Sequence, residues 1–558
     1  MKDGYRRLLT LQPEINTVSV VDRNTLVINN ALKIAPKVVI TYSGKYWCRG
    51  NRGGEGGSYY RYDRDPAGIT WWQAGDGNGS PGGINIPSNR TFEMRDNVTL
   101  KMRGTFMHAY NFITIWNKEN VTIRGGNIIG DFDLDPALNE HKRADGTFDE
   151  GQWGYGISLQ GSKNVLIENV DISKMWADGI NLSPDYLHNY IVNSNITIRN
   201  TKSHHNRRQG MSIDGGSKLT FYGCEFSNIK GQDPQSGVDL ERDTNNSLVQ
   251  LKDVLFIGCK FLNNMIGART AYSPKDEISV KFDHCLFDGN VSWDYDSYTA
   301  SGIVFTNCKF AYQQSRFFSI ELVGTKNHKF ENCEFNNAIR TRPRDVGTVT
   351  YRCKNLYFEN SKCLNVRYNS SNLYKFFDLS NSINAKIKHC KFESTSLQDD
   401  RILISADGAE NIEVINNTMR ELGEIFVIKN VNGFKFNNNT EINTLRVTGI
   451  FKGNVKHFEM CRNQFSGNSY FSKNALAPVL YLDGTGTAFG KITDNVVYKD
   501  AIFTPISKPN SNGTGLYREY SSTSDNIVIA NNKTFGFTNE NAFQFNVAST
   551  NLSVSYFK

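Results

Sequence analysis

Three acidic residues fall in two short segments of one pattern, GMSID and GVDLE, which begin at Gly210 and Gly237. Asp214 closes the first segment, and Asp239 and Glu241 alternate in the second. Alternate residues of a strand share a face about 6.6 Å apart, and paired strands lie about 4.8 Å apart. If the segments are neighbouring strands, the three carboxylates meet on one surface and cannot all ionise at their usual pKa values. An acid with a raised pKa beside an ionised partner is what glycosidic bond cleavage requires.

Three arginines, one aspartate and three aromatic residues near these segments are the candidates for contact with a substrate. They are Arg207 and Arg208 before Gly210, Arg269 on the next expected strand, Asp178 before Gly179, and the aromatic residues Trp153, Tyr155 and Trp176. Each has an alternative interpretation: a charge-balanced surface ladder for the charged residues, a turn residue for Asp178, and ordinary packing for the aromatic rings. His204 and His205 could supply a base, although solvated loop histidines are the commoner case.

The acidic run GDFDLDP, which holds Asp131, Asp133 and Asp135, is similar to the start of a calcium-binding loop. The glycine at the sixth position and the closing glutamate of that loop are missing. No CxxC pair occurs either, which argues against a zinc site. We therefore predict no metal and no cofactor.

Four glycine-led segments must position the candidate residues: GISLQ at Gly156, GINLS at Gly179, GMSID at Gly210 and GVDLE at Gly237. Their spacings of 23, 31 and 27 residues indicate the same strand in four consecutive coils. Alternation then assigns the faces. The inward residues are Ile157, Leu159, Ile180, Leu182, Met211, Ile213, Val238 and Leu240. One outward column is Ser158, Asn181, Ser212 and Asp239, and the next is Gln160, Ser183, Asp214 and Glu241.

The whole chain repeats a short apolar-alternating strand, an Asn, Gly or Cys turn and a second strand, as in NVTIRGGNIIG from Asn120 and KLTFYGCEFSN from Lys218. The repeats are spaced 23 to 35 residues apart and lack helical periodicity. This pattern predicts an all-β, parallel β-helix, in which stacked coils share one core. Cys224, Cys259, Cys285 and Cys308 follow the turn in consecutive coils and predict a column of reduced, buried thiols.

Composition limits the partners and the organisation of the chain. The net charge of +7 over 558 residues contains no Lys/Arg block, so nucleic acid is not the expected partner. No apolar run is long enough to insert in a membrane, and MKDGYRRLLTLQPE is not a secretory signal. We predict an N-terminal cap with a Gly/Arg-rich loop over residues 1–83, the β-helix over 84–498, and last coils with C-terminal strands over 499–558, where trimer contacts are expected.

The runs HNRRQGMSIDGG, GQDPQSGVDLE and WADGINL resemble segments of right-handed, single-stranded β-helix proteins of the pectate-lyase-like superfamily. The resemblance covers roughly residues 84–300 and extends to bacteriophage tailspikes that degrade capsules or other surface polysaccharides. It implies a homotrimer in a virion tail, joined to the tail or baseplate through an N-terminal region, or alternatively a secreted bacterial enzyme. The calcium-binding Asp cluster and Arg base of pectate lyases, and the NTD, GHG and RIK motifs of polygalacturonases, are not matched.

The residues and the resemblance together predict a depolymerase that cleaves glycosidic bonds of a bacterial surface polysaccharide. In this hypothesis Glu241 and Asp214 form the acid and base or nucleophile pair, and Asp239 tunes them. A lyase that uses Arg208, Tyr155 or a histidine as its base remains the enzymatic alternative. A non-catalytic glycan-binding spike or adhesin is the alternative outside enzymes.

Overall fold

The computed structural model describes residues 11–50, 83–103, 109–135, 138, 153–186, 188–242, 246, 248–272, 278–311, 318–364, 374–394, 401–442, 448–466, 480–483, 486–498, 517–520, 524–535, 543–544 and 553–556. The Gly/Arg-rich stretch after Asn51 lies outside the described residues. The chain forms two compact units, Met1–Asp296 (unit 1) and Ser297–Lys558 (unit 2). Both units are built as right-handed parallel β-helix, which confirms the predicted fold class.

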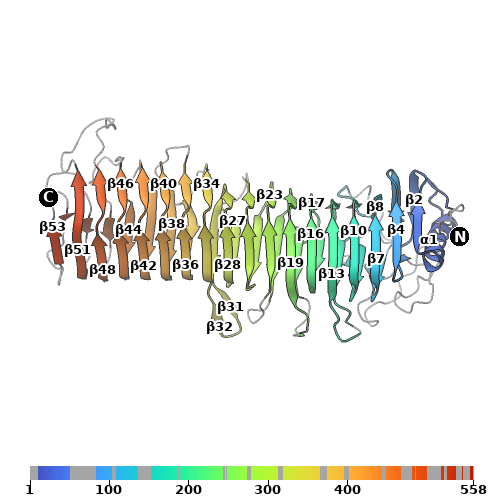
Figure 1. The fold of residues 1–558 in the computed structure, drawn as a ribbon, viewed down its shortest axis with the longest axis horizontal. Coiled ribbons are helices and arrows are strands. Elements are labelled where there is room, and N and C mark those ends of the chain that lie inside the picture. The colour runs from blue at the N-terminus through green and yellow to red at the C-terminus, as the bar shows by residue number, and fades with distance from the viewer. Residues whose placement is uncertain are drawn as a thin grey trace. The chain divides into compact units, whose positions relative to one another are not determined.

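Unit 1 consists of coils that each contribute one strand to three parallel sheets, A, B and C (Figure 1). Sheet A contains β1 (Lys37–Ile40), β4 (Arg90–Met94), β7 (Glu119–Arg124), β10 (Lys163–Glu168), β13 (Asn193–Arg199), β16 (Gly216–Tyr222), β19 (Leu251–Ile257) and β22 (Val280–Asp283). Sheet B contains β2 (Gly44–Cys48), β5 (Val98–Met102), β8 (Asn127–Ile129), β11 (Asp171–Ser173), β14 (Lys202–His204), β17 (Glu225–Ser227), β20 (Lys260–Leu262) and β23 (Leu286–Asp288). Sheet C contains β3 (Ile84–Asn85), β6 (Ala109–Trp116), β9 (Trp153–Gln160), β12 (Asp178–Ser183), β15 (Gln209–Ile213), β18 (Ser236–Glu241), β21 (Ile266–Ala271) and β24 (Trp293–Tyr298).

Unit 2 repeats the same three-sheet coil and adds one antiparallel hairpin, β31 (Arg344–Val346) with β32 (Val349–Tyr351), which projects from the stacked strands (Figure 1). Its sheet A contains β25 (Ile303–Thr306), β28 (Lys326–Glu331), β33 (Lys354–Glu359), β36 (Ile383–Lys388), β39 (Glu410–Ile415), β42 (Asn432–Asn437), β45 (Lys456–Cys461), β48 (Thr487–Thr493), β51 (Ser524–Phe535) and β53 (Ser553–Tyr556). Its sheet B contains β26 (Lys309–Phe310), β29 (Glu334–Phe335), β34 (Lys362–Leu364), β37 (Lys391–Glu393), β40 (Thr418–Arg420), β43 (Thr440–Ile442), β46 (Gln464–Ser466) and β49 (Val496–Tyr498). Its sheet C contains β27 (Phe318–Val323), β30 (Ala338–Arg342), β35 (Tyr374–Asp378), β38 (Arg401–Asp407), β41 (Glu424–Lys429), β44 (Gly449–Lys452), β47 (Leu480–Asp483), β50 (Tyr517–Tyr520) and β52 (Phe543–Gln544).

Identical side chains stack on one another inside the coils because parallel strands pair in register. In unit 1 the rings of Phe221, Phe256 and Phe282 stack with centroids 4.5 and 4.7 Å apart. All ten cysteines are free and buried, and Cys259 contacts Cys224 on one side and Cys285 on the other, as the predicted thiol column requires. Such columns give each coil an apolar neighbour above and below, which explains how the coils within a unit share one core.

Asparagine residues at the turns adopt the left-handed backbone conformation that the tight corners require. Asn120, Asn164 and Asn195 have φ angles of 58°, 56° and 54°. Each side chain also donates to the preceding one, from Asn164 Nδ2 to Asn120 Oδ1 at 3.0 Å and from Asn195 Nδ2 to Asn164 Oδ1 at 2.8 Å. Asparagine tolerates this conformation and hydrogen-bonds locally, which accounts for its recurrence at the turn of each repeat.

An α-helix, α1 (Val18–Ile34), precedes the first coil, although its sequence alternates weakly in NTVSVV and NTLVINN. The helical spacing of Val21, Ile28 and Leu32 places all three on one fully buried face. That face packs against β1, β2 and β3, and Figure 1 shows α1 beside β2. The helix thus covers apolar residues at the N-terminal end of unit 1. Within the described residues, no helix is long and apolar enough to cross a bilayer.

Candidate active site on sheet C of unit 1

The strand register on sheet C confirms the predicted alignment of the four glycine-led segments. Ile157 pairs with Ile180, Ile180 with Met211, and Met211 with Val238. The eight residues predicted to face inward are all fully buried. Asp239 pairs with Ser212 on one side and with Arg269 on the other, so Arg269 stacks beside Asp239 as expected.

The leading glycines are required because the next coil approaches too closely for a side chain. A Cβ atom on Gly210 would lie 2.4 Å from the carbonyl oxygen of Gly237, and one on Gly237 would lie 2.5 Å from that of Gly267. The same contact continues from Gly267 to the carbonyl oxygen of Asp294, also at 2.5 Å. These backbone contacts fix the height of each coil at the start of its sheet C strand, next to the polar columns.

Asp178 is fully buried at the start of β12, yet its contacts lie on the outward side of the sheet. Its Oδ2 atom accepts a hydrogen bond from Ser212 Oγ at 2.8 Å and lies 3.5 Å from Arg208 Nη1. Ser212 Oγ in turn accepts from Asn181 Nδ2 at 3.0 Å. Asp178 therefore belongs to the polar network of the site and is not merely a turn residue.

Asp239 is fully buried on β18, with Oδ2 accepting a hydrogen bond from Gln209 Nε2 at 2.7 Å. Burial and, next, the nearby charge of Glu241 raise the pKa of Asp239 to about 7, against the opposing effect of Arg269 and Arg208. A carboxyl group with this pKa exchanges its proton near neutral pH, as acid–base chemistry requires.

Arg208 lies between the two buried carboxyl groups and keeps its charge. Burial disfavours the guanidinium ion, but Asp178, the Tyr155 hydroxyl and Asp239 outweigh burial and raise the pKa of Arg208 above its usual value. Its side chain is 17% exposed. Arg208 can therefore both neutralise the buried carboxylates and reach a ligand at the surface.

Glu241 and Asp214 are the most accessible carboxyl groups of the predicted trio. Glu241 ends β18 and is partly exposed, whereas Asp214 follows β15 and is 7% exposed. The backbone N–H of Asp214 donates to the Leu182 carbonyl at 3.0 Å, and Ile213 pairs with Leu240. The two acids therefore occupy adjacent rungs of the outward column, as the sequence predicted.

The aromatic candidates divide into an exposed and a buried set. Trp153 is 41% exposed at the start of β9, and Tyr155 is nearly buried. Trp176 is 1% exposed, because the guanidinium of Arg207 lies 4.1 Å from its ring centroid and the edge of Phe132 packs against it. The expectation that Trp176 stacks on a sugar was wrong for this reason. Arg207 is also held, with Nη2 donating to Gln232 Oε1 at 3.1 Å.

A chain of two histidines and one aspartate was not expected from the sequence. His204 ends β14, and its Nε2 atom lies 2.8 Å from Asp171 Oδ1 on the adjacent β11. Its Nδ1 atom lies 2.6 Å from Nδ1 of His205. Partial burial, His204 and Lys174 lower the pKa of His205. On sheet B, Asp171 pairs in register with Lys202, two residues before His204 in the next coil. Aligning the sheet B strands of the two coils from the sequence would therefore have placed Asp171 near His204.

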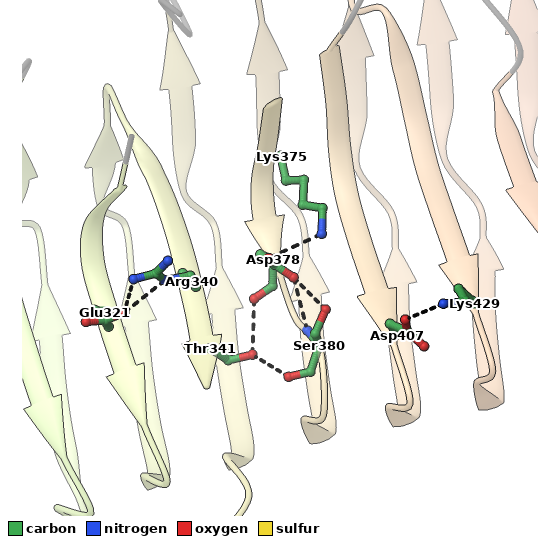
Figure 2. A network of polar contacts seen from close by, with 8 residues as sticks. All are labelled: Glu321, Arg340, Thr341, Lys375, Asp378, Ser380, Asp407 and Lys429. Carbon is green, nitrogen blue, oxygen red and sulfur yellow. Dashed lines mark hydrogen bonds and ion pairs between the residues drawn. The ribbon is translucent and has the colours of Figure 1, made fainter. Parts of the chain in front are cut away.

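The sheet C columns of unit 2 show what a charge-balanced ladder looks like (Figure 2). Arg340 pairs with Glu321 in register and donates from Nε at 2.8 Å. Asp378 accepts from Lys375 at 3.3 Å, and Lys429 lies 3.0 Å from Asp407. Every carboxylate drawn has a cation within reach. The Asp239–Glu241 pair differs, since the charge of Glu241 raises the pKa of the buried Asp239 on the same strand.

Within the described part of the chain, no group of three or more His, Cys, Asp or Glu side chains has an arrangement that could hold a metal ion. Asp133 instead forms an ion pair with Lys174, which lowers the pKa of Asp133. Asp131 accepts a hydrogen bond from Tyr110 at 2.8 Å.

Residues 78–252 and 150–299 match the family described as right handed beta helix region. A stretch of 226 residues is 30% identical to the SPbeta prophage-derived uncharacterized protein YorA of Bacillus subtilis (strain 168), covering 39% of this chain and 37% of that protein. A stretch of 166 residues is 32% identical to the uncharacterized protein YclG of the same organism, covering 28% and 27%. The chain therefore spans well under half the length of these relatives.

Three solved structures are similar to the chain at low identity. The pre-mature gene product 12 of bacteriophage phi29 has a TM-score of 0.41 at 11% identity and covers 91% of this chain and 70% of that one. A tailspike protein of the E. coli bacteriophage HK620, in complex with a pentasaccharide, has a TM-score of 0.36 at 10% identity and covers 98% and 78%. PfbA, a surface adhesin of Streptococcus pneumoniae, has a TM-score of 0.33 at 12% identity and covers 78% and 88%.

Proposed function

We propose that this right-handed β-helix protein is a depolymerase that hydrolyses glycosidic bonds of a bacterial surface polysaccharide on sheet C of unit 1. The observation that carries the proposal is the fully buried Asp239, whose pKa is raised to about 7, beside the partly exposed Glu241 on the same strand. Glycosidases use two carboxyl groups in different roles, and a buried neighbour with a raised pKa leaves Glu241 to act with Asp214 in this way. Arg208 and Arg269 flank them.

In this proposal Glu241 and Asp214 act on the scissile bond, one as acid and the other as base or nucleophile. Asp239 tunes them from beneath the surface, because a fully buried group does not touch a polymer. A separation of about 5 Å between the two carboxyl groups would favour retention of configuration, and a wider gap inversion. The residues assigned to substrate binding are Arg207, Arg208, Tyr155, Trp153 and Arg269, and the fully buried Asp178 acts through its ion pair with Arg208.

The biological setting that we propose is the tail of a bacteriophage, where the protein serves host recognition and entry. Similarity to a prophage-derived protein supports a phage origin. A homotrimer joined to the tail or baseplate through an N-terminal region completes this proposal, and secretion by a bacterium is the alternative setting.

A lyase that acts on a uronate-containing polymer would need an uncharged base at the same surface. The carboxylates around Arg208 raise its pKa and disfavour it in that role. His205, whose pKa is lowered, is the neutral base that this alternative would use. We favour hydrolysis because Asp214 and Glu241 directly follow the paired residues Ile213 and Leu240 on sheet C, whereas His204 ends the sheet B strand β14 and His205 follows it.

The test is incubation of the full chain with a panel of purified capsular and exopolysaccharides, followed by assays of reducing ends and of near-ultraviolet absorbance. Hydrolysis predicts new reducing ends without the absorbance of an unsaturated sugar, whereas a lyase produces both. Glu241→Gln and Asp214→Asn should abolish cleavage, while Glu119→Gln, an exposed acid on β7, should not. Binding without any growth of reducing ends would identify a glycan-binding spike and contradict the proposal.

A further inference from the structure

Gln209 is a buried residue of sheet C to which the proposed reaction has so far given no role. It is 1% exposed at the start of β15, where it pairs with Asp178 on β12 and with Ser236 on β18. Its amide Nε2 donates to Asp239 Oδ2 at 2.7 Å. The side chain thus lies on the rung between Asp178 and Ser236 and donates to Asp239, the acid that neighbours Glu241.

The contact between Gln209 and Asp239 leaves two buried acceptors. Gln209 Oε1 and Asp239 Oδ1 are both inaccessible, and neither has a hydrogen-bond partner. An ionised carboxylate and an amide oxygen only accept, so they cannot satisfy each other. A buried acceptor without a donor destabilises the folded state relative to a satisfied one.

Protonation of Asp239 supplies the donor that these two buried acceptors lack. When Asp239 is protonated, its carboxyl group contains one donor and one acceptor, which complement the acceptor and the donor of a primary amide. The bond from Nε2 to Oδ2 is retained, and the acid hydroxyl adds a donor to a pair that otherwise leaves the amide oxygen without one. Nearby charges act in both directions: Glu241 on β18 and Asp178 on β12 disfavour a negative Asp239, whereas Arg269 on β21 and Arg208 before β15 favour it. Together with burial, the net effect raises the pKa of Asp239.

We propose that Gln209 is a positioning residue whose amide holds Asp239 as an uncharged carboxylic acid, so that Glu241 carries the negative charge of the pair. This inference rests on the proposed function and refines it. Glu241 becomes the base or nucleophile, and the proton delivered to the leaving group comes from Asp214. In this arrangement no negative charge on Asp239 opposes the negative charge that Glu241 carries.

The decisive variant is Asp239→Asn, which reproduces the size and neutrality of the protonated acid. In the wild type, the thermal unfolding temperature should fall as the pH rises from about 4 to about 7, because the unfolded state releases the Asp239 proton in this range while the folded state retains it. The variant should lose this fall and should be the more stable protein on the alkaline side. Its infrared spectrum should also lose the carbonyl band that protonated Asp239 contributes. The matched control is Asp131→Asn, another buried acid with a hydrogen-bond donor, Tyr110, which should keep both features.

The role of Gln209 itself is tested with Gln209→Leu. Loss of the amide should displace the pH at which the unfolding temperature falls and should move the matching limb of the pH–activity profile, with kcat changed more than KM. An unchanged pH dependence in both Asp239→Asn and Gln209→Leu would overturn the inference. If the pH effects are found but no polymer is cleaved, the amide–acid pair stands and the proposed hydrolysis fails.

Discussion

Arg208 Nη1 lies 3.5 Å from Asp178 Oδ2, and this contact joins two consecutive coils at the start of sheet C. Asp178 is fully buried, and Arg208 is 17% exposed. Ser212 donates to the same carboxylate oxygen at 2.8 Å. Arg208 therefore compensates the negative charge of the buried Asp178. Its contribution to stability can be measured separately from any contact with a substrate.

Arg208→Gln should destabilise the protein by roughly 3 kcal/mol, because it leaves the carboxylate of Asp178 buried without its cation. The measurement is the midpoint of urea unfolding. The double variant Arg208→Gln/Asp178→Asn should recover a large part of the loss, since the uncompensated charge is then absent. Additive losses in the double variant would show that the two residues do not stabilise each other.

Gly210→Ala should be strongly destabilising, by about 3 kcal/mol, because the added Cβ would meet the Gly237 carbonyl oxygen at 2.4 Å and backbone must shift. Gly258→Ala is the matched control. Gly258 has a φ of 60° with nothing within 4 Å of the added atom, so only the left-handed backbone is disfavoured, at about 1 kcal/mol. Thermal unfolding of both variants distinguishes close packing of coils from turn geometry. Equal losses would contradict the packing argument.

The outward columns of the site were predictable from the sequence because they depend on two simple periods. The spacing of Gly156, Gly179, Gly210 and Gly237 gives the coil, and alternation gives the face. Asp239 beside Arg269, and Asp214 on the rung next to Glu241, follow from these periods alone. The buried cysteine column follows from the same argument.

The alternation rule assigned the wrong face to the first residue of a sheet C strand. Strict alternation places the residue before each glycine on the inner face, with Ile180 and Leu182, yet Asp178 bonds to the outward Ser212. Gln209 occupies the equivalent position and was missed for the same reason. Trp176 was misassigned because the sequence does not reveal that Arg207 and Phe132 cover its ring. Trp176, Arg207 and Phe132 lie in segments between strands, where alternation does not predict which side chains meet.

The ten cysteines should be unreactive in the folded protein, because all of them are free and buried. Burial raises the pKa of Cys48 and of Cys390 to about 12, so the reactive thiolate is scarce as well as inaccessible. Titration with Ellman's reagent should therefore detect no fast thiol under native conditions and ten thiols in denaturant. A thiol that reacts rapidly in the native protein would contradict the predicted packing of its coil.

His328 should make unit 2 sensitive to acid, because it is fully buried and its pKa is lowered to about 4 by burial, which the Lys326 carbonyl only partly offsets. Its Nδ1 atom lies 3.0 Å from that carbonyl, and its Nε2 atom lies 3.3 Å from Ser297 Oγ. The neutral ring is therefore held with its proton on Nδ1. Since the unfolded ring binds a proton near pH 6.5, the unfolded state gains more protons than the folded state between about pH 6.5 and pH 4.

Stability should consequently fall as the pH drops through that range, by about 3 kcal/mol for this group. His328→Leu should remove this contribution, because the ring pairs in register with Leu356 and an aliphatic side chain suits the column. The exposed His389 provides the control variant His389→Asn, which should retain the full acid loss. The difference between the unfolding free energies of wild type and His328→Leu, measured against pH, isolates the histidine from carboxyl groups that titrate in the same range. A flat difference curve would show that His328 becomes protonated without opening its coil.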